Sequence, residues 1–547
     1  MNNSFLHYCN ETYETLRERV YRFDRIRETE ALLSWIQKLA QYASAQHPGR
    51  YADGEIENIA FEIGKNLDHI LESNQRDTSH FDPPRFEKTS KPHILHIATR
   101  IYKVGGHSRI IGHWIHNDSA SRHSLLLIDQ KREAVPVWIQ ENVSKSGGNF
   151  IVLPSEASLL MKAKWLREIA QSNVEAVILH HHPYDVVPIV AFAESASIPP
   201  VGILNHADHV FWLGSSVADT MIHFRESGKN LAENRRFGKH HNLLPLPLAS
   251  EKTEMNRIKA RRELKIPYEQ ISLLSIGTPY KYIPTETHNF FETGIKILNQ
   301  NPEAHLYLIG VKEEQAKKHI QGALPDRFHC LGILEDTLLY CHATDLYLEG
   351  FPFTSTTALL EPASLGVPVM LSYAPTSNLL VTDDLALKDF TYAANEEVYL
   401  KKVSSLIRNK AERLRLGEQL RESVHSVHVG GIWHDHLQST YASLRKATHQ
   451  PRPLPVSPYL ENKDDLALSR FNYVLANSFY FSDFLETNLN KFSWAELFGL
   501  FVKSFKPGLE KLSIGSLRKW MSLFCLKIDK AGLYPRTKQW FRSLALE

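Results

Sequence analysis

The stretch that decides the fold is TDLYLEGFPFTSTTALLEPASLGVPVMLS, residues 344–372. An apolar run ends at Glu349, four hydroxyl residues occupy 354–357, and an apolar segment then leads to a β-branched run at 367–369. The Gly and Pro residues between these runs mark turns. The pattern predicts a strand, a loop, a helix, a turn and a second strand, with the hydroxyl residues at the N-terminus of the helix.

The four hydroxyl residues allow two interpretations. At a helix N-terminus the backbone N–H groups point outward and the helix dipole favours an anion, so hydroxyl groups there would add donors to a phosphate. The same residue types also commonly cap a helix without binding anything. The stretch alone leaves both interpretations open for Thr354, Ser355, Thr356 and Thr357.

Length and composition bound the class of protein. A chain of 547 residues is too long for one hydrophobic core, so two or three domains are expected. The 43% hydrophobic and 23% charged residues are typical of a soluble globular protein, and a net charge of +2 does not demand a nucleic-acid partner. The four cysteines are scattered and fit neither a disulfide framework nor a zinc spacing, which indicates a reducing compartment.

The first twenty residues, MNNSFLHYCNETYETLRERV, lack a basic region followed by an apolar core. We therefore expect no signal peptide. No apolar run reaches the roughly 18 residues that a membrane-spanning helix needs. The expected location is the cytoplasm.

The chain divides into segments that differ in hydrophobic periodicity. Residues 1–85 have helical periodicity and end in a proline-rich linker, which predicts a helical N-terminal domain. From 91 to 248, short apolar runs alternate with amphipathic stretches, which predicts βα units around a parallel sheet. The expected strands are 93–99, 123–129, 150–154, 175–182 and 200–206, with short additions at 221–224 and 243–248.

The alternation restarts from 258 to 448 after a hinge that contains Pro245, Pro247 and a polar stretch. The expected fold is therefore α/β, with two facing Rossmann-like domains and helical extensions at both ends. In such sheets ligands bind beyond the carboxyl ends of the strands, so the site should lie between the two domains. The expected strands of the second domain are 271–277, 305–310, 328–332, 345–350 and 367–372.

The tail at 459–547 has a helical pattern and carries Trp494, Trp520 and Trp540 with many basic residues. Aromatic stripes with basic flanks are commonly a packed face beside a solvated one. An interfacial surface for a membrane or for an oligomer contact is the alternative.

Histidines follow three of the expected strands. In KVGGHSR (103–109), Gly105 and Gly106 permit a close backbone approach and His107 opens the next helix, although a tight turn with a capping imidazole would look the same. HHHPYD (180–185) and NHADH (205–209) also stand at strand ends. Consecutive side chains on a strand alternate between faces, so the three adjacent histidines cannot bind one ion, and no metal is expected.

A lysine loop stands in the second domain. In SIGTPYKYIP (275–284), Gly277 and Thr278 end a strand and Lys281 follows. A lysine that faces a hydroxyl-rich helix start would supply a point charge and oriented donors to a diphosphate; a surface lysine is the alternative. Glu361 lies in the helix, where a carboxylate could bind ribose hydroxyls. Neither a GxGxxG fingerprint nor a P-loop is present in the chain.

Together these segments resemble the GT-B superfamily of nucleotide-sugar glycosyltransferases. EGFPFTSTTALLEPASLGVPV is similar to its donor-binding signature, in which an acidic residue shortly precedes a G-x-P turn. Two glutamates eight residues apart mark the common retaining branch, but Glu349 and Glu361 are twelve apart. Phe351–Pro352–Phe353, the Thr356–Thr357 pair and Glu361 more closely match the branch of O-GlcNAc transferase and the bacterial cytoplasmic N-glycosyltransferases.

The resemblance covers about residues 93–440 and implies roles for individual residues. TPYKYIP is similar to the loop bearing the donor-phosphate lysine, which implies that role for Lys281. GGHSR resembles the histidine-bearing first loop, which places His107 near the reacting centre, and LNHAD resembles a short G-H-P loop, with His206 at the histidine. No 34-residue repeat precedes these segments, so the tetratricopeptide repeats of that branch are missing.

The implied activity is metal-independent transfer of a hexose or N-acetylhexosamine from a UDP-sugar, with inversion, to a protein or saccharide acceptor; UDP-sugar is a substrate and no cofactor is expected. His107 would orient the acceptor or take its proton. Alternatives are a retaining enzyme of surface polysaccharide or glycolipid synthesis that uses Glu349, a nucleotide-sugar epimerase, and an inactive scaffold. The expected donor-binding residues are Gly277, Thr278, Lys281, Phe353, Thr354, Ser355, Thr356, Thr357 and Glu361, and the acceptor-side candidates are Gly106, His182, Asp185, His206 and Asp208.

Overall fold

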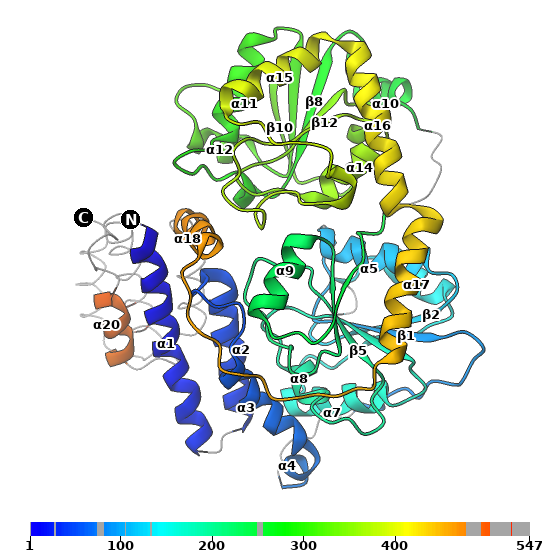
Figure 1. Cartoon of the computed structure of the whole chain (residues 1–547), viewed down its shortest axis with the longest axis vertical. Helices are drawn as coiled ribbons and strands as arrows, with labels where there is room; N and C mark the ends of the chain where they lie inside the picture. Colours follow the sequence, from blue (N-terminus) through cyan, green and yellow to red (C-terminus); the bar gives the residue numbers. More distant parts are fainter. Residues whose placement is uncertain are drawn as a thin grey trace.

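The computed structural model describes residues 2–26, 29–73, 81–103, 105–131, 134–248, 255–476, 494–503, 524 and 527. Two parallel β-sheets form two lobes, each sheet flanked by helices, and a third, helical part lies beside the first lobe (Figure 1). The architecture is therefore α/β, with helical segments before the first sheet and after the second.

The first sheet is entirely parallel, in the order β3-β2-β1-β4-β5-β6-β7. Its central strands β1 and β4 are buried along their whole length, as expected for strands covered by helices on both faces. The strands are β1 (His93–Ala98), β2 (Arg122–Leu127), β3 (Phe150–Val152), β4 (Ala176–His180), β5 (Val201–Leu204), β6 (Thr220–His223) and β7 (His241–Leu243). The helices among them are α5 (Gly106–Asn117), α6 (Val137–Lys145), α7 (Leu159–Ala170), α8 (Val187–Ala191) and α9 (Glu226–Arg235).

The second sheet is parallel in the order β10-β9-β8-β11-β12. Its strands are β8 (Ile271–Ile276), β9 (Ala304–Ile309), β10 (Phe328–Gly332), β11 (Leu346–Leu348) and β12 (Val369–Met370). Its helices are α10 (Arg257–Leu264), α11 (Phe290–Gln300), α12 (Glu313–Ala316), α13 (Leu338–Ala343), α14 (Thr356–Ser364), α15 (Glu396–Arg408) and α16 (Lys410–His428). The lysine loop forms a short 3-10 turn, η2 (Pro279–Tyr282).

One expected strand is displaced. The apolar stretch 243–248 was expected to pair, but β7 ends at Leu243 and lies mainly before that stretch. Pro245 and Pro247 have no backbone N–H to donate to a neighbouring strand, so pairing stops where they begin. The stretch instead connects the two lobes, and Leu246 and Leu248 pack into a core that both lobes share.

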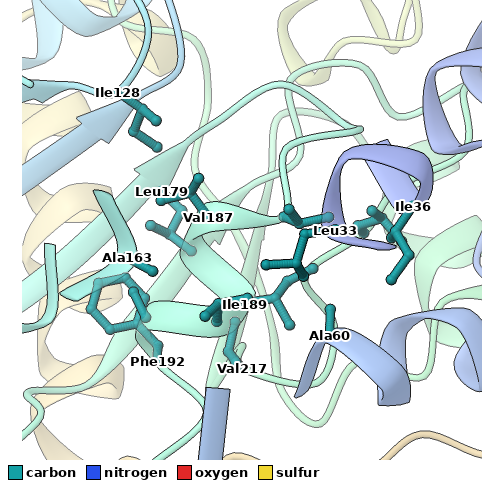
Figure 2. Close-up of a cluster of buried hydrophobic side chains, with 14 of the residues drawn as sticks. Leu33, Ile36, Ala60, Ile128, Ala163, Leu179, Val187, Ile189, Phe192 and Val217 are labelled. Atoms are coloured by element: carbon teal, nitrogen blue, oxygen red, sulfur yellow. The ribbon is translucent and has the colours of Figure 1, made fainter. Parts of the chain in front are cut away.

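The N-terminal helices share one hydrophobic core with the first sheet. Leu33 and Ile36 of the second helix and Ala60 of the third meet Val187 and Ile189 of α8 (Figure 2). This apolar contact is continuous with the strands, so the helical part is packed as a wall of the first lobe. These helices are α1 (Asn2–Ile26), α2 (Thr29–Gln46), α3 (Gly54–Lys65) and α4 (Leu67–Ser73).

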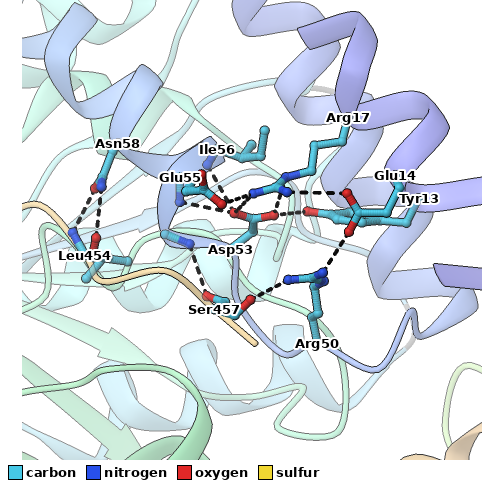
Figure 3. A network of polar contacts seen from close by, with 11 residues as sticks. Tyr13, Glu14, Arg17, Arg50, Asp53, Glu55, Ile56, Asn58, Leu454 and Ser457 are labelled. Atoms are coloured by element: carbon cyan, nitrogen blue, oxygen red, sulfur yellow. Dashed lines mark hydrogen bonds and ion pairs between the residues drawn. The ribbon is translucent and has the colours of Figure 1, made fainter. Parts of the chain in front are cut away.

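A buried carboxylate organises the start of α3. Asp53 caps the helix by accepting from the backbone N–H groups of Glu55 and Ile56, at 3.1 and 3.2 Å. It also accepts from the Tyr13 hydroxyl at 2.8 Å and pairs with Arg17 at 3.0 Å (Figure 3). These partners on α1 compensate the burial of the charge, which would otherwise be costly.

After the second sheet the chain returns to the first lobe. α17 (Gly430–Lys446) packs on the first sheet, and Tyr441 accepts from the Trp114 indole at 2.8 Å. An extended segment, 447–462, then runs along the first lobe to the N-terminal helices, where Ser457 meets Gly54 and Arg50 (Figures 1 and 3). α18 (Lys463–Ala476) packs on α1 and α2, and α20 (Trp494–Lys503) follows.

Much of the expected helical tail, including Trp520 and Trp540, lies outside the described residues. Trp494 begins α20, and Lys527 lies over its ring, 5.5 Å from the centroid. Among the helices that the structure describes, none is both long enough and apolar enough to span a membrane.

Candidate functional site

Loops at the carboxyl ends of the two sheets enclose two adjoining cavities. The first, here the His107 chamber, has a volume of about 310 Å³ and is lined by His107, His206 and Arg225 among others. The second, here the Glu361 chamber, has about 420 Å³ and is lined by Arg109 and Glu361 among others. Both chambers share the same wall, formed by Gly106, Tyr280, Lys281, Thr356 and Thr357. The site lies between the lobes, at the strand ends where ligands bind in this class of sheet.

Lys281 lies in the shared wall. Its ammonium donates to the backbone carbonyl of Thr354 at 2.7 Å and lies over the ring of Phe353, 5.0 Å from the centroid. Burial, and then the nearby Arg225, lower the pKa of Lys281 to about 7. The described residues give this ammonium no carboxylate partner, so it remains available to an anion that enters either chamber.

The first turn of α14 supplies the other part of the wall. Ser355 stands at the N-cap position, but its side chain makes no capping hydrogen bond. Thr356 and Thr357 begin the helix and line both chambers. The Thr354 hydroxyl is used elsewhere, because it pairs with the Thr382 hydroxyl at 2.9 Å. The helix start therefore presents backbone N–H groups and the Thr356 and Thr357 hydroxyls to the cavities, as an anion site would.

The remaining donor-side candidates lie around the same wall. Gly277 and Thr278 follow β8 and line the Glu361 chamber, together with apolar residues at the ends of β9 and β10. Phe353 lines the His107 chamber. The nine candidates predicted for donor binding therefore all line one chamber or the other.

Glu361 pairs with a residue that the sequence did not point to. Arg109, on α5 of the first lobe, donates to the Glu361 carboxylate, and both side chains are partly exposed to the Glu361 chamber. The pair joins the two lobes across the site. Arg109 stands in the quoted GGHSR segment, so only its distance in sequence from Glu361 hid the contact.

His107 is held by a backbone contact. Its Nε2 lies 3.0 Å from the carbonyl of His180, so Nε2 carries the hydrogen. Burial lowers the pKa of His107 to about 4, so the ring is neutral at physiological pH and Nδ1 keeps its lone pair. The ring of His206 stacks on it at 4.1 Å between centroids.

Two glycines allow the lobes to meet here. Gly105 has φ +142°, a conformation that side chains disfavour. A Cβ on Gly106 would lie 3.0 Å from the hydroxyl oxygen of Thr357 in the opposite lobe. The predicted close backbone approach is therefore an approach to α14, and it brings the first lobe against the helix start.

The acceptor-side candidates separate into two groups. His206 and Asp208 line the His107 chamber, beside Gly106. His182 pairs with the Tyr184 hydroxyl at 2.8 Å, and Asp185 accepts from the Thr99 hydroxyl at 2.6 Å; neither lines either chamber. Burial raises the pKa of Asp185 to about 6, and its two hydrogen bonds, to Thr99 and to the backbone of α8, give it a local structural role.

Arg225 is a second cation in the His107 chamber, and the sequence analysis missed it. It holds Asp208 with two hydrogen bonds of 2.6 Å. It also donates to the carbonyls of Asn378, Leu379 and Val381 in the second lobe. No motif marks this arginine, because its partners are mostly backbone carbonyls distant in sequence.

Glu349 lies apart from both chambers. It is fully buried and accepts from the backbone N–H groups of Ser372 at 2.7 Å and Thr382 at 3.1 Å. Burial raises the pKa of its carboxyl group, against the effect of these hydrogen bonds. Its contacts tie the end of β11 to the loops that follow it.

The adjacent histidines point to different partners. His180 bonds His96 at 2.9 Å, His181 bonds the Leu213 carbonyl at 3.0 Å, and His182 bonds Tyr184. Across the ranges that the structure describes, no group of three or more His, Cys, Asp or Glu side chains could hold a metal ion.

No family model and no curated protein matches the chain. Among solved structures, it is similar to a glycosyltransferase from Rickettsia africae, with TM-score 0.50, 11% identity, and coverage of 65% of this chain and all of that one. A Thermobaculum terrenum O-GlcNAc transferase mutant matches with TM-score 0.43 and 14% identity over 81% of this chain and 97% of that one. Anabaena HepE, in complex with UDP and glucose, matches with TM-score 0.48 and 13% identity over 64% of this chain and all of that one. The two facing parallel sheets and the likeness to the Rickettsia protein show that the chain has the GT-B fold.

Proposed function

We propose that the protein is a glycosyltransferase that transfers a hexose or N-acetylhexosamine from a UDP-sugar to a protein acceptor, without a metal ion and with inversion at the anomeric carbon. The observation that carries the proposal is the shared wall of the two chambers. Lys281, Thr356 and Thr357 stand where a cavity suited to a nucleotide meets a cavity that contains a neutral histidine.

The Glu361 chamber suits the nucleotide. Ile276, Ile309, Ile333 and Leu334 offer an apolar surface to a flat base, and Glu361 offers a carboxylate to ribose hydroxyls. The Arg109 contact satisfies that carboxylate while the chamber holds no ribose. The diphosphate would then lie at the shared wall, with the sugar in the His107 chamber.

The chemical demand on the site is to stabilise the leaving diphosphate. As the bond between the anomeric carbon and the diphosphate oxygen breaks, negative charge builds on that oxygen. The Lys281 ammonium and the N-terminus of α14 are donors fixed in advance in a largely buried wall, where such groups are most effective. Arg225 lines the same region, but its charge is paired with that of Asp208, so Lys281 and the helix start carry the proposed stabilisation, which needs no metal.

His107 is the proposed general base. Its Nε2 hydrogen is committed to the His180 carbonyl, so Nδ1 is the nitrogen that can take a proton. It would remove the proton from the acceptor hydroxyl or amide as that group attacks the anomeric carbon and UDP leaves. Attack from the side opposite UDP inverts the configuration at that carbon.

The retaining alternative would need a carboxylate near the donor sugar. Glu349 is a poor candidate, because it lines neither chamber and two backbone N–H groups occupy its oxygens. Three carboxylates, Asp208, Asp383 and Asp384, line the His107 chamber. Asp208 is committed to Arg225, Asp383 accepts from the backbone N–H of Ser227, and Asp384 pairs with His428. These commitments support inversion.

We place the enzyme in the cytoplasm. Cys9, Cys330 and Cys341 are free thiols, which suits a reducing compartment. A protein acceptor is proposed from the likeness of the FPF, Thr-Thr and lysine segments to the O-GlcNAc transferase branch. A saccharide acceptor is the alternative that the acceptor assay must test.

The deciding experiment measures binding and turnover together. Thermal shift with UDP-, GDP- and TDP-sugars reports which donor the folded protein binds, because a ligand of the native state raises the melting temperature. Release of UDP is then followed with and without an acceptor, and with EDTA. Stabilisation without turnover would indicate a binding scaffold, isomerisation of the sugar without acceptor would indicate an epimerase, and loss of turnover in EDTA would contradict the metal-independent mechanism.

A further inference from the structure

α18 reaches from the helical N-terminal part to the second lobe. Near its start, Asp465 is fully buried and pairs with His47 at 2.9 Å and with Arg235 at 3.2 Å. The preceding residue, Asp464, accepts from the Ser377 hydroxyl of the second lobe at 2.7 Å. The helix therefore has fixed anchors outside the donor site.

The helix brings one aromatic ring against that site. Phe471 stacks on Phe353 with ring centroids 5.4 Å apart and planes 20° apart. Both rings are buried in a small cluster that also contains Leu379, Leu380 and Leu468. The cluster draws residues from α18 and both lobes, and it contributes Phe353 and Leu379 to the wall of the His107 chamber.

Phe353 is in turn the support of Lys281. The Lys281 ammonium lies over the Phe353 ring at 5.0 Å, and the Phe353 backbone N–H donates to the Lys281 carbonyl at 3.3 Å. The ammonium also donates to the Thr354 carbonyl and lies 6.0 Å from the centroid of the Tyr280 ring, which is farther away than that of Phe353. The Phe353 ring is therefore the nearer of two rings that hold the charge in position.

We infer that Phe471 is a positioning residue for the proposed sugar transfer: by holding the Phe353 ring, it fixes the ammonium of Lys281 at the shared wall of the two chambers. The reaction named here rests on the proposed function, but the dependence of Lys281 on Phe471 does not. Phe471 lines neither chamber; it lines a separate cavity of about 340 Å³ beside Pro352 and Leu380, so its effect on the two chambers would pass through Phe353.

The environment of the ammonium makes the dependence measurable. Besides Lys281, the charged or titratable side chains that line the His107 chamber are those of His107, His206, Asp208, His209, Arg225, Tyr280, Asp383 and Asp384. The Glu361 chamber adds Arg109 and Glu361. Arg225 is paired with Asp208, and Arg109 with Glu361. Loss of the Phe471 ring would loosen Phe353 and admit water to the ammonium. Hydration favours the charged form of a lysine, so the midpoint at which Lys281 loses its proton would rise.

The experiment compares Phe471→Ala with Leu468→Ala in the full chain. Leu468 lies on the same helix and in the same cluster but has no ring to stack on Phe353, so its truncation is a matched control. Competitive acetylation at a series of pH values, read by mass spectrometry of the peptide that contains Lys281, reports the midpoint in each protein without any need for turnover. We expect the midpoint to lie near 7 in the parent chain and in Leu468→Ala, and to rise by about one pH unit in Phe471→Ala.

Turnover supplies the second readout. In Phe471→Ala, kcat for UDP release should fall by about tenfold or more with a smaller change in KM, because a small displacement of a catalytic charge costs rate. Phe471→Tyr keeps the ring and should restore both readouts. If Phe471→Ala melts below the assay temperature, Phe471→Leu replaces it.

Two outcomes are distinguishable. If Lys281 titrates alike in Phe471→Ala, Leu468→Ala and the parent chain, the positioning role is wrong, whatever the enzyme does. If no nucleotide sugar stabilises the parent chain or is turned over by it, the proposed function is wrong. The titration still decides whether Phe471 controls the position of Lys281.

Discussion

Replacing Lys281 by alanine removes the charge that faces the proposed leaving group. The ammonium sits in a largely buried wall, and none of the residues that the structure describes gives it a carboxylate partner, so no neighbouring group is released to substitute for it. Two unit charges about 4 Å apart at an effective dielectric constant of about 20 interact by about 4 kcal/mol. At about 1.4 kcal/mol per factor of ten, Lys281→Ala should lower kcat by about a thousandfold.

The assay is single-turnover cleavage of a UDP-sugar in the presence of acceptor, with thermal melting as the check on folding. Lys317→Ala is the matched control, because Lys317 is an exposed lysine of the same lobe that pairs with Glu313 on the surface. It should turn over at the parent rate. A loss below about tenfold in Lys281→Ala, in a protein that melts like the parent, would contradict the electrostatic role, since one well-placed donor alone is commonly worth about a hundredfold.

The same reasoning fixes the sign of the pH dependence. A lysine is charged below its pKa, and that of Lys281 is lowered to about 7 in the free protein. The value of kcat/KM should therefore fall as the pH rises through about 7. A bound diphosphate favours the charged ammonium, so the fall in kcat should occur at higher pH than the fall in kcat/KM.

Three further substitutions test the other roles. His107→Ala should lower transfer about a hundredfold or more while UDP still raises the melting temperature, because a general base acts on the acceptor and not on the nucleotide; equal loss of UDP binding would place His107 elsewhere. Glu361→Ala should weaken UDP binding by about ten- to a hundredfold in calorimetry, as expected for loss of a hydrogen bond to a charged group, and should erase the preference for UDP over its 2′-deoxy analogue. Glu349→Gln should keep turnover within about tenfold of the parent. It should lower the free energy of unfolding, measured by urea titration, by about 1–3 kcal/mol, because it changes an acceptor of two buried backbone N–H groups. A collapse of turnover without loss of stability would favour the retaining mechanism.

The fold followed from periodicity because each βα unit is locally encoded. Buried parallel strands such as β1 and β4 appear as continuous apolar runs, and Gly and Pro mark their ends. The misplaced strand at 243–248 shows the limit of that signal. Its leucines are apolar because they pack between the lobes, and periodicity alone cannot distinguish that burial from a strand.

The sequence pointed to a site residue where the same short segment contains both the residue and the pattern that marks it. Lys281 and the α14 hydroxyls stand directly after strands, and strand ends converge. Arg109, Arg225 and Phe471 were missed because their roles depend on partners in other segments: Glu361 lies 252 residues from Arg109, and Val381 lies 156 residues from Arg225. His182 and Asp185 were included because they follow a strand, but their side chains turn toward Tyr184 and Thr99.

The extended segment 447–462 has a consequence for the order in which the chain can fold. The N-terminal helices are made first, yet the groups that complete them arrive late: His47 meets Asp465 across 418 residues, and Gly54 meets Ser457 across 403. Such non-local contacts close only after a large loss of chain entropy, which slows folding. During synthesis, the polar groups of this helical part that bond Asp465 and Ser457 would stay without those partners until both Rossmann-like lobes have emerged. We therefore expect a chain cut at residue 446 to aggregate or bind chaperones, although every strand of both sheets is present in it.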